Sequence, residues 1–359
     1  MDHNSSALKE ASLPKERLAL FITCILSVLF TLGMYGAGFL LYLALLIIMN
    51  DLIPSPWTPT DGDPAVRAWL ETLKSYALIA LILLLILIIA GFLLKKFKIS
   101  LGSSIILMLP ILSYFSFAMT WLSGMSALMM LWLPIVNVSP ELLALGDIFF
   151  APFLVPIMFL WGISSEDNLL LFRGSSGTLL WWLKIMIPLL ITTIGIGLFT
   201  FSITTWLYGK SQGKEIVTFW IYKYSHHPQY LGFLLTTYGL VILLGFVPNQ
   251  ERFIPAPSLF WLIAAMCVLS MAIREENRLL AKADAQYINW RAHTPFMMPL
   301  PTQVTNLIRW LVKLLIRKEW PESDKEILFI VFIYSMILIL LSLPIIIVCY
   351  PWSPIWENV

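Results

Sequence analysis

The chain has 359 residues, of which 59% are hydrophobic and 12% are charged, and its mean hydropathy is +0.85. Because a soluble domain carries about 25% charged residues, this composition excludes an ordinary water-soluble globular protein. The net charge of +2 comes without any basic stretch interleaved with aromatic residues, so nucleic-acid binding is not expected. The three cysteines, Cys24, Cys267 and Cys349, lack the spacing of a disulfide framework or a zinc site, and no metal is expected.

Long apolar runs dominate the sequence, and a bilayer core needs roughly 20 such residues per helix. We therefore expect an all-α, polytopic transmembrane helical bundle with about eight or nine membrane segments. The first run is too long for a signal-peptide core, so it is expected to remain as a first span, either one tilted helix or a tight hairpin. The candidate spans are 18–49, 75–94, 101–122, 147–163, 178–208, 229–247, 257–273 and 327–349, with a shorter, ambiguous piece at 124–137.

Lysine and arginine gather in three loops, at 95–98, 210–223 and 274–325. Loops rich in these residues usually face the cytoplasm, so all three are expected on that side. An even number of crossings must then separate the first loop from the second, which favours counting 124–137 as a short span. Within the third loop, 303–318 combines apolar residues at helical spacing with a basic stripe of Arg309, Lys313 and Arg317. This pattern predicts an interfacial amphipathic helix on the cytoplasmic leaflet, with anchoring as its simplest role.

A first polar cluster stands at the mouth of the span 229–247, and includes Tyr224, His226, His227 and Tyr230. Pro228 fits the first turn of a helix, where its missing N–H costs nothing. The two histidines then precede a helix N-terminus, whose free N–H groups and dipole favour a bound carboxylate. Gly232, one turn into the helix, leaves room for a ligand to approach the backbone.

A second polar cluster follows the next span and begins with Arg274, Glu275 and Glu276, with Tyr287, Trp290 and Arg291 further on. Two adjacent carboxylates close to hydrocarbon are costly unless they are paired or used. Because the spans 229–247 and 257–273 form a hairpin, both clusters are expected at the same membrane surface. Each cluster alone is equally compatible with a solvated loop flanked by interfacial aromatic residues.

Together these pieces resemble the isoprenylcysteine carboxyl methyltransferases and the related phospholipid methyltransferases. The similarity lies in Tyr224-Ser-His-His-Pro-Gln-Tyr-Leu-Gly232, Glu275-Glu-Asn-Arg-Leu279, Tyr287 and Thr294-Pro-Phe-Met-Met-Pro299. Their order and spacing agree with the family pattern, and they cover about 210–300, under a third of the chain. The resemblance implies a membrane enzyme that transfers a methyl group from S-adenosylmethionine to a lipid or lipidated substrate entering from the bilayer, in a cofactor pocket at the cytoplasmic face.

The resemblance also implies residue roles. The cofactor would be held by Tyr224, His226, His227, Tyr230, Gly232 and Glu276. Glu275, Glu276 and Arg274 would act in catalysis, and Tyr287, Trp290 and Arg291 would bind the substrate. A carboxylate and aromatic faces suit the cationic sulfonium of this cofactor.

The chain departs from the family pattern at three places. His226 replaces the arginine that precedes His-Pro, so any charge it contributes depends on pH. Ala283-Asp284 replaces a Phe-Gly pair, and Trp290 replaces the second tyrosine. The predicted regions are thus a transmembrane part of unassigned role (1–175), a methyltransferase-like catalytic part (176–300) and an interfacial helix with a C-terminal span (301–359).

Two other functions stay open at this point. Membrane sterol reductases carry a similar His-x-x-Tyr-x-Gly piece and bind NADPH, whose 2′-phosphate could meet Lys223 or Arg291; the Glu-Glu-x-x-Leu piece argues against them. A non-enzymatic transporter would need charges within the spans, and only Asp147 and Lys184 lie near span ends. The methyl acceptor, the oligomeric state and the cellular membrane stay undetermined.

Overall fold

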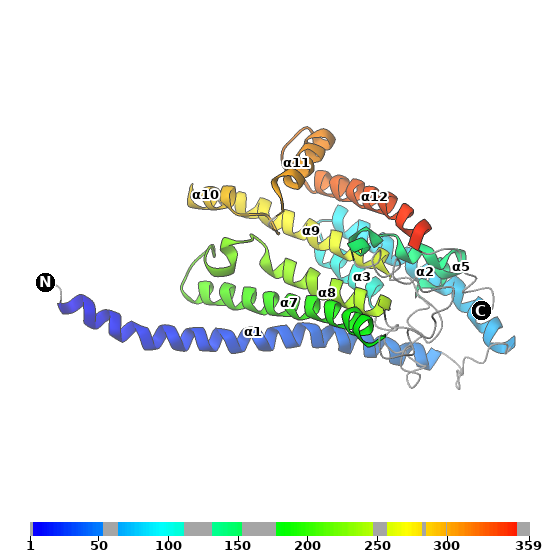
Figure 1. The fold of residues 1–359 in the computed structure, drawn as a ribbon, viewed down its shortest axis with the longest axis horizontal. Helices are drawn as coiled ribbons and strands as arrows, with labels where there is room; N and C mark the ends of the chain where they lie inside the picture. Colours follow the sequence, from blue (N-terminus) through cyan, green and yellow to red (C-terminus); the bar gives the residue numbers. More distant parts are fainter. Residues whose placement is uncertain are drawn as a thin grey trace.

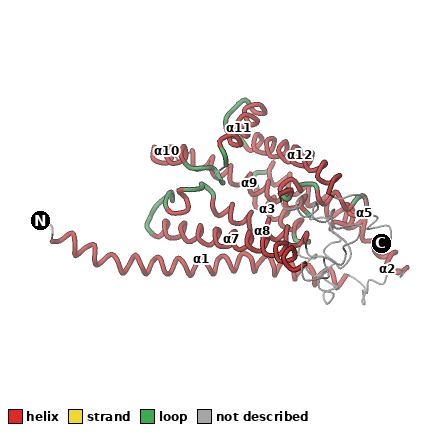
Figure 2. The backbone as a smooth tube through the Cα atoms, viewed as in Figure 1, coloured by secondary structure: helices red, strands yellow, loops and turns green. Residues whose placement is uncertain are grey.

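The protein is described from a computed structural model, which covers residues 3–52, 64–110, 131–152, 177–246, 257–281, 285–298 and 300–349. Over these ranges the chain is all-helical, without any strand, as Figures 1 and 2 show. The predicted all-α fold is therefore confirmed for the part of the chain that is described.

The first half of the chain begins with one uninterrupted helix, α1 (His3–Leu52), so the first apolar run is a single helix and not a hairpin. Helix α2 (Pro64–Leu93) contains the second predicted span, and α3 (Phe97–Met108) covers only the start of the third, whose residues 111–122 lie outside the described ranges. Helix α5 (Leu133–Val138) ends the ambiguous piece, of which 124–130 lie outside. The predicted span 147–163 starts with the 3₁₀ helix Asp147–Phe149, and its residues from 153 onward lie outside.

The second half follows the predicted boundaries closely. It comprises α7 (Gly177–Ser211), a 3₁₀ helix (Trp220–Lys223), α8 (Pro228–Phe246), α9 (Ser258–Leu280), α10 (Ala285–His293), α11 (Thr302–Ile316) and α12 (Asp324–Cys349). Figure 1 shows α7 and α8 side by side, with α1 running along α7 and extending beyond the bundle.

Five of the described helices are long and apolar enough to cross a membrane: Lys15–Ala44, Ser75–Leu93, Met186–Ser211, Ser258–Leu280 and Asp324–Ile347. Their outward faces carry large apolar side chains, among them Leu29, Leu83 and Leu340, which are each more than half exposed. Exposing so large an apolar surface to water would be unfavourable, whereas the acyl chains of a lipid bilayer would cover it. The chain is a membrane protein.

The core lies where both halves of the chain meet. Trp132 is fully buried, stacks on Phe260 of α9 with ring centroids 4.6 Å apart, and donates its indole N–H to the carbonyl of Leu107 at 3.0 Å. The same apolar cluster takes in residues of α2, α8 and α9. The core therefore crosses the predicted boundary at residue 175.

Small residues let α7 and α8 approach until their backbones touch. A Cβ atom on Gly195 would lie 2.4 Å from the backbone nitrogen of Thr236, and one on Gly239 would lie 2.7 Å from the carbonyl oxygen of Pro188. Helix α1 is joined to α7 by polar contacts, such as the 2.6 Å hydrogen bond between the hydroxyls of Ser27 and Thr204. Close approach and interhelical hydrogen bonds are the usual means of packing helices in lipid, where apolar burial gives no driving force.

Candidate functional site

The two histidines are fixed by the way α8 begins. Pro228 occupies the first helical position, and the carbonyl of His227 accepts the first helical hydrogen bond, from the Leu231 N–H at 3.1 Å. The Ser225 hydroxyl accepts the His227 N–H at 3.2 Å, and the His226 N–H is donated to the carbonyl of Pro295 at 3.0 Å. Both histidine side chains are buried as a result.

Glu276, near the C-terminal end of α9, is the centre of the site and is fully buried. One carboxylate oxygen, Oε1, accepts the Nε–H of Arg291 at 2.5 Å and lies 3.5 Å from His226 Nδ1. The other oxygen, Oε2, lies 3.3 Å from His227 Nε2. A buried carboxylate needs such compensation, and here three basic side chains from two separate segments supply it.

Glu275 points away from this centre, because neighbouring residues on a helix lie about 100° apart. Its side chain is partly exposed, and its Oε2 accepts the hydroxyl of Tyr230 at 2.9 Å. Close to Glu275, the hydroxyl of Tyr222 donates a hydrogen bond to Gln229 Oε1 at 2.5 Å. Burial raises the pKa of the Tyr222 phenol, the negative charge of Glu275 raises it further, and the bond to Gln229 opposes both.

Helix α10 closes the site from a third direction. The ring of Trp290 lies 4.5 Å from that of His226 by centroids, and its indole N–H is donated to the Tyr222 carbonyl at 3.1 Å. Tyr287 is buried beside Trp290. Burial raises the pKa of the Tyr287 phenol, and the charge of Glu276 together with a hydrogen bond to it adds to the shift.

Seven of the predicted site residues therefore come together: His226, His227, Tyr230, Glu275, Glu276, Trp290 and Arg291, with Tyr287 next to them.

Three other predicted residues lie apart from this group. The guanidinium of Arg274 lies 3.8 Å from the centroid of the Phe97 ring, and its Nε lies 3.4 Å from Asp324. Gly232 faces α7, where an added Cβ would lie 2.5 Å from the backbone nitrogen of Phe199, so this glycine serves helix packing. Tyr224 is 68% exposed and points to a separate groove.

This groove, of about 870 Å³, lies between α1, α7 and the 3₁₀ helix that precedes the histidines. It is mostly apolar, and Lys223 is the cation among its described lining residues. Its wall of Ile221, Lys223 and Tyr224 belongs to the same short segment as Tyr222, which faces the site. The lining consists of Leu20, Cys24, Val28, Gly197, Thr200, Phe201, Thr204, Trp220, Ile221, Lys223 and Tyr224.

Sequence reasoning missed two residues that adjoin the site. Trp320 comes from the loop between α11 and α12, and its ring lies 5.1 Å from the guanidinium of Arg291. Asn277 follows Glu276 on α9 and accepts the indole N–H of Trp320 at 2.7 Å. The sequence does contain one signal for this loop. Ser323-x-x-Glu326 is a capping-box pattern, which marks the start of a helix and therefore the end of the loop that carries Trp320.

Among the described residues, no group of three or more His, Cys, Asp or Glu side chains is placed to hold a metal ion. No protein-family model, curated protein or solved structure matches this chain. The resemblance to the membrane methyltransferases therefore rests on the motif residues of the sequence alone.

Proposed function

We propose that this chain is a membrane-embedded methyltransferase that uses S-adenosylmethionine and acts on a lipid-like or lipidated substrate. The observation that carries the proposal is the meeting of two motif segments at Glu276, which contacts His226, His227 and Arg291. A buried carboxylate with three basic partners is costly to build, and such arrangements concentrate at functional sites.

The residues present fit the chemical groups of this cofactor. His226 Nε2 is buried and has no hydrogen-bond partner among the described residues, and a bound ligand carboxylate would supply the missing partner. Glu275 is partly exposed and carries one hydrogen bond, from Tyr230, so its charge is available to an ammonium or sulfonium group. The rings of Trp290 and Phe296 pack beside His226 and His227 and are partly exposed, so they are the aromatic groups that an adenine would meet.

The two carboxylates would have different tasks. Glu276 is already neutralised by its protein partners, so it would orient the histidines and Arg291. Glu275 would contact the cofactor directly. Bound S-adenosylmethionine would supply an electrophilic methyl group, and the protein would contribute alignment of the acceptor and exclusion of water.

The apolar groove supports a lipid-like substrate. Its α1 and α7 walls belong to helices long enough to cross the membrane, so its opening faces the region where lipid is expected. The segment Trp220–Tyr224 lies between the two, because it lines the groove and also carries Tyr222, whose carbonyl accepts the indole N–H of Trp290. An acyl or isoprenoid chain lying in this groove would bring its polar end towards Tyr222.

We further propose a multi-pass topology of eight or nine segments, with the site at the cytoplasmic face and α11 on that leaflet. Arg274 donates a hydrogen bond to the carbonyl of Lys95 at 3.3 Å, so the first and third basic loops meet at one end of the bundle. On α11, Leu307 and Leu314 are exposed beside Arg309, as a helix lying on an anionic surface requires.

The reductase alternative is less well supported. A 2′-phosphate needs an available cation, and the charge of Arg291 is already paired with the buried carboxylate of Glu276. Lys223 lines the membrane groove and not the histidine site.

Equilibrium binding of S-adenosylmethionine to the full chain in lipid nanodiscs tests the proposal, with NADPH titrated in parallel. We expect the wild type to bind S-adenosylmethionine and Glu275→Gln to bind it at least about tenfold more weakly, because a charge-assisted contact is lost. Glu319→Gln, which neutralises an exposed carboxylate outside the site, should bind like the wild type. Binding of NADPH alone would move the protein to the reductases, and binding of neither ligand would remove the enzyme proposal.

A further inference from the structure

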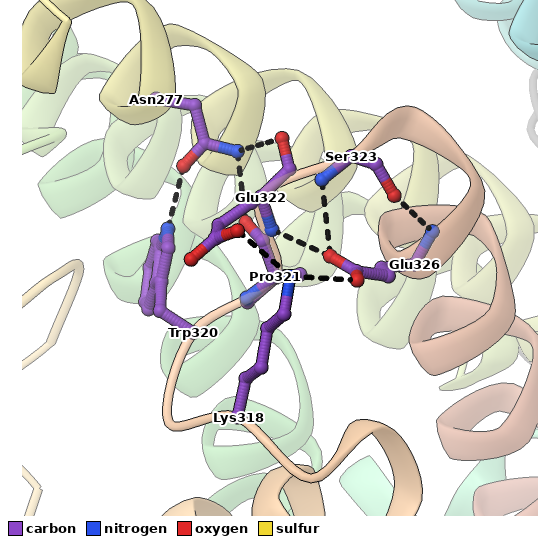
Figure 3. Close-up of polar contacts among 7 residues, drawn as sticks. All are labelled: Asn277, Lys318, Trp320, Pro321, Glu322, Ser323 and Glu326. Carbon is purple, nitrogen blue, oxygen red and sulfur yellow. Dashed lines mark hydrogen bonds and ion pairs between the residues drawn. The ribbon is translucent and has the colours of Figure 1, made fainter.

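The side-chain amide of Asn277 on α9 is hydrogen-bonded to the loop between α11 and α12, as Figure 3 shows. Asn277 Oδ1 accepts the indole N–H of Trp320 at 2.7 Å, while Asn277 Nδ2 donates to the carbonyl of Pro321 at 2.8 Å. Because donor and acceptor of one side chain are both used, Trp320 is held in a defined place beside Arg291. We call this pair of bonds the Asn277 clasp.

Further polar contacts fix the end of the loop where α12 begins. Ser323 and Glu326 form a reciprocal capping box at the start of α12, in which Glu326 Oε2 accepts the Ser323 N–H at 3.1 Å and Ser323 Oγ accepts the Glu326 N–H at 3.2 Å. Lys318 lies 2.7 Å from Glu322 and 3.1 Å from Glu326 (Figure 3). Hydrogen bonds to these two carboxylates raise the pKa of the Lys318 ammonium.

From this position Trp320 closes a ring of contacts that includes the buried carboxylate of Glu276. Its ring lies 5.3 Å from Phe296 by centroids, and Phe296 lies 5.1 Å from His227. On its other side it lies 5.1 Å from the guanidinium of Arg291, which is hydrogen-bonded to Glu276. The guanidinium therefore lies between a carboxylate and an indole face.

We propose that Trp320 is a positioning residue: held by Asn277, it keeps Arg291 on Glu276 and forms the outer wall of the cofactor site. The inference rests on the proposed function for the identity of the ligand. It makes the C-terminal region, which lies outside the motif resemblance, part of the binding site. A cation over an indole face is stabilised by the ring electrons, and an aromatic wall excludes water from the ion pair.

The test measures the affinity of the full chain in nanodiscs for S-adenosylmethionine. We expect Trp320→Ala to weaken binding by about tenfold, because the cation–π contact and the clasp are both lost. Trp320→Phe keeps a ring beside Arg291 but lacks the N–H that Asn277 accepts, so it should restore only part of that loss. Trp310→Ala removes a 59% exposed indole from α11, and should leave binding unchanged.

A coupling measurement separates positioning from general loss of structure. In an Asn277→Ala background the clasp is already absent, so Trp320→Phe should weaken binding no further. Trp320→Ala binding like the wild type, or Trp310→Ala lowering the affinity equally, would overturn the inference while leaving the methyltransferase proposal in place.

If the wild type binds no S-adenosylmethionine, the proposed function fails first, and the positioning role is then decided by thermal unfolding. Trp320→Ala and Arg291→Gln should lower the midpoint by less together than the sum of the two single changes. Additive changes would show that Trp320 does not hold Arg291.

Discussion

Among single residues, Glu275 and Glu276 are neighbours on α9, but their carboxylates lie in opposite environments, one partly exposed and the other buried. Glu276 is fully buried among three basic side chains, whereas Glu275 is partly exposed and bonded to Tyr230. Removing one member of a buried charged group leaves the others uncompensated, which costs more than the group itself contributes. The two positions should therefore respond differently to the same substitution.

We expect Glu276→Gln to lower the free energy of unfolding by about 1–3 kcal/mol, since Arg291 loses its counter-charge in a buried position. Glu275→Gln removes a partly exposed charge and should stay within about 0.5 kcal/mol of the wild type. Thermal unfolding of both variants in the same detergent checks this. Equal midpoints for the two variants would contradict the structural role given to Glu276.

Among the helices, α7 and α8 form the tightest pair, and their glycines decide the distance between them. On α7, Gly195 faces α8 with no room for a Cβ atom, whereas Gly197, two residues later, has nothing within 4 Å of that position. The two glycines therefore allow a controlled comparison on one helix, because Gly195 lies at the contact with α8 and Gly197 does not.

Gly195→Ala should destabilise the protein by about 1–3 kcal/mol, because the added methyl group forces two backbones apart. Gly197→Ala has space and removes backbone freedom from the unfolded chain, so it should be neutral or stabilising by up to about 1 kcal/mol. Thermal unfolding of the two variants decides between them. A stable Gly195→Ala protein would mean that α7 and α8 do not touch at this point.

In the molecule as a whole, three connections between distant segments gather the polar loops at one end. Arg274 reaches the carbonyl of Lys95, His226 reaches Pro295, and Asn277 reaches Pro321. Two of the three basic loops, 95–98 and 274–325, contribute to this end, and its cytoplasmic orientation stays a prediction from the positive-inside rule.

Single-cysteine variants test this arrangement in a background in which Cys24, Cys267 and Cys349 are replaced by serine. Lys96→Cys, Lys214→Cys and Glu319→Cys each place a thiol at an exposed position of one basic loop. A membrane-impermeant maleimide should label all three from the cytoplasmic face of sealed vesicles and none from the opposite face. Labelling of one position from the other face would refute the shared orientation.

Sequence reasoning located the helices well where a single property, apolar length, decides them. The boundaries of α7, α8, α11 and α12 lie within about three residues of the predicted ones, whereas α9 continues to Leu280, beyond the predicted end at 273; α1 is one of the two forms left open. At the start of the predicted span 147–163 the chain forms a short 3₁₀ helix, and the residues of that span from 153 onward lie outside the described ranges. Hydropathy measures apolar content, and it cannot detect a local turn around Gly146, whose φ of 141° interrupts a helix.

The candidate site was predicted as a set of residues and not as an arrangement. The sequence indicated that His226, His227, Glu275 and Glu276 would meet, because two spans joined as a hairpin return to one surface. It gave no reason to separate Arg274 from that group, although Arg274 contacts Phe97 and Asp324. Side-chain direction depends on which helices pack against each face, and periodicity alone does not supply that.

The sequence by itself determined that this is an apolar, helical membrane protein with a polar cluster at the ends of two helices. The length of an apolar run and the spacing of a local motif are properties of contiguous residues. Both can therefore be recognised in the sequence without knowledge of the fold. Only the tertiary structure decided that Glu276 is the buried carboxylate, that Gly232 packs against Phe199, and that Trp320 borders the site. Those facts depend on contacts between residues far apart in the chain, which are set when the helices pack together.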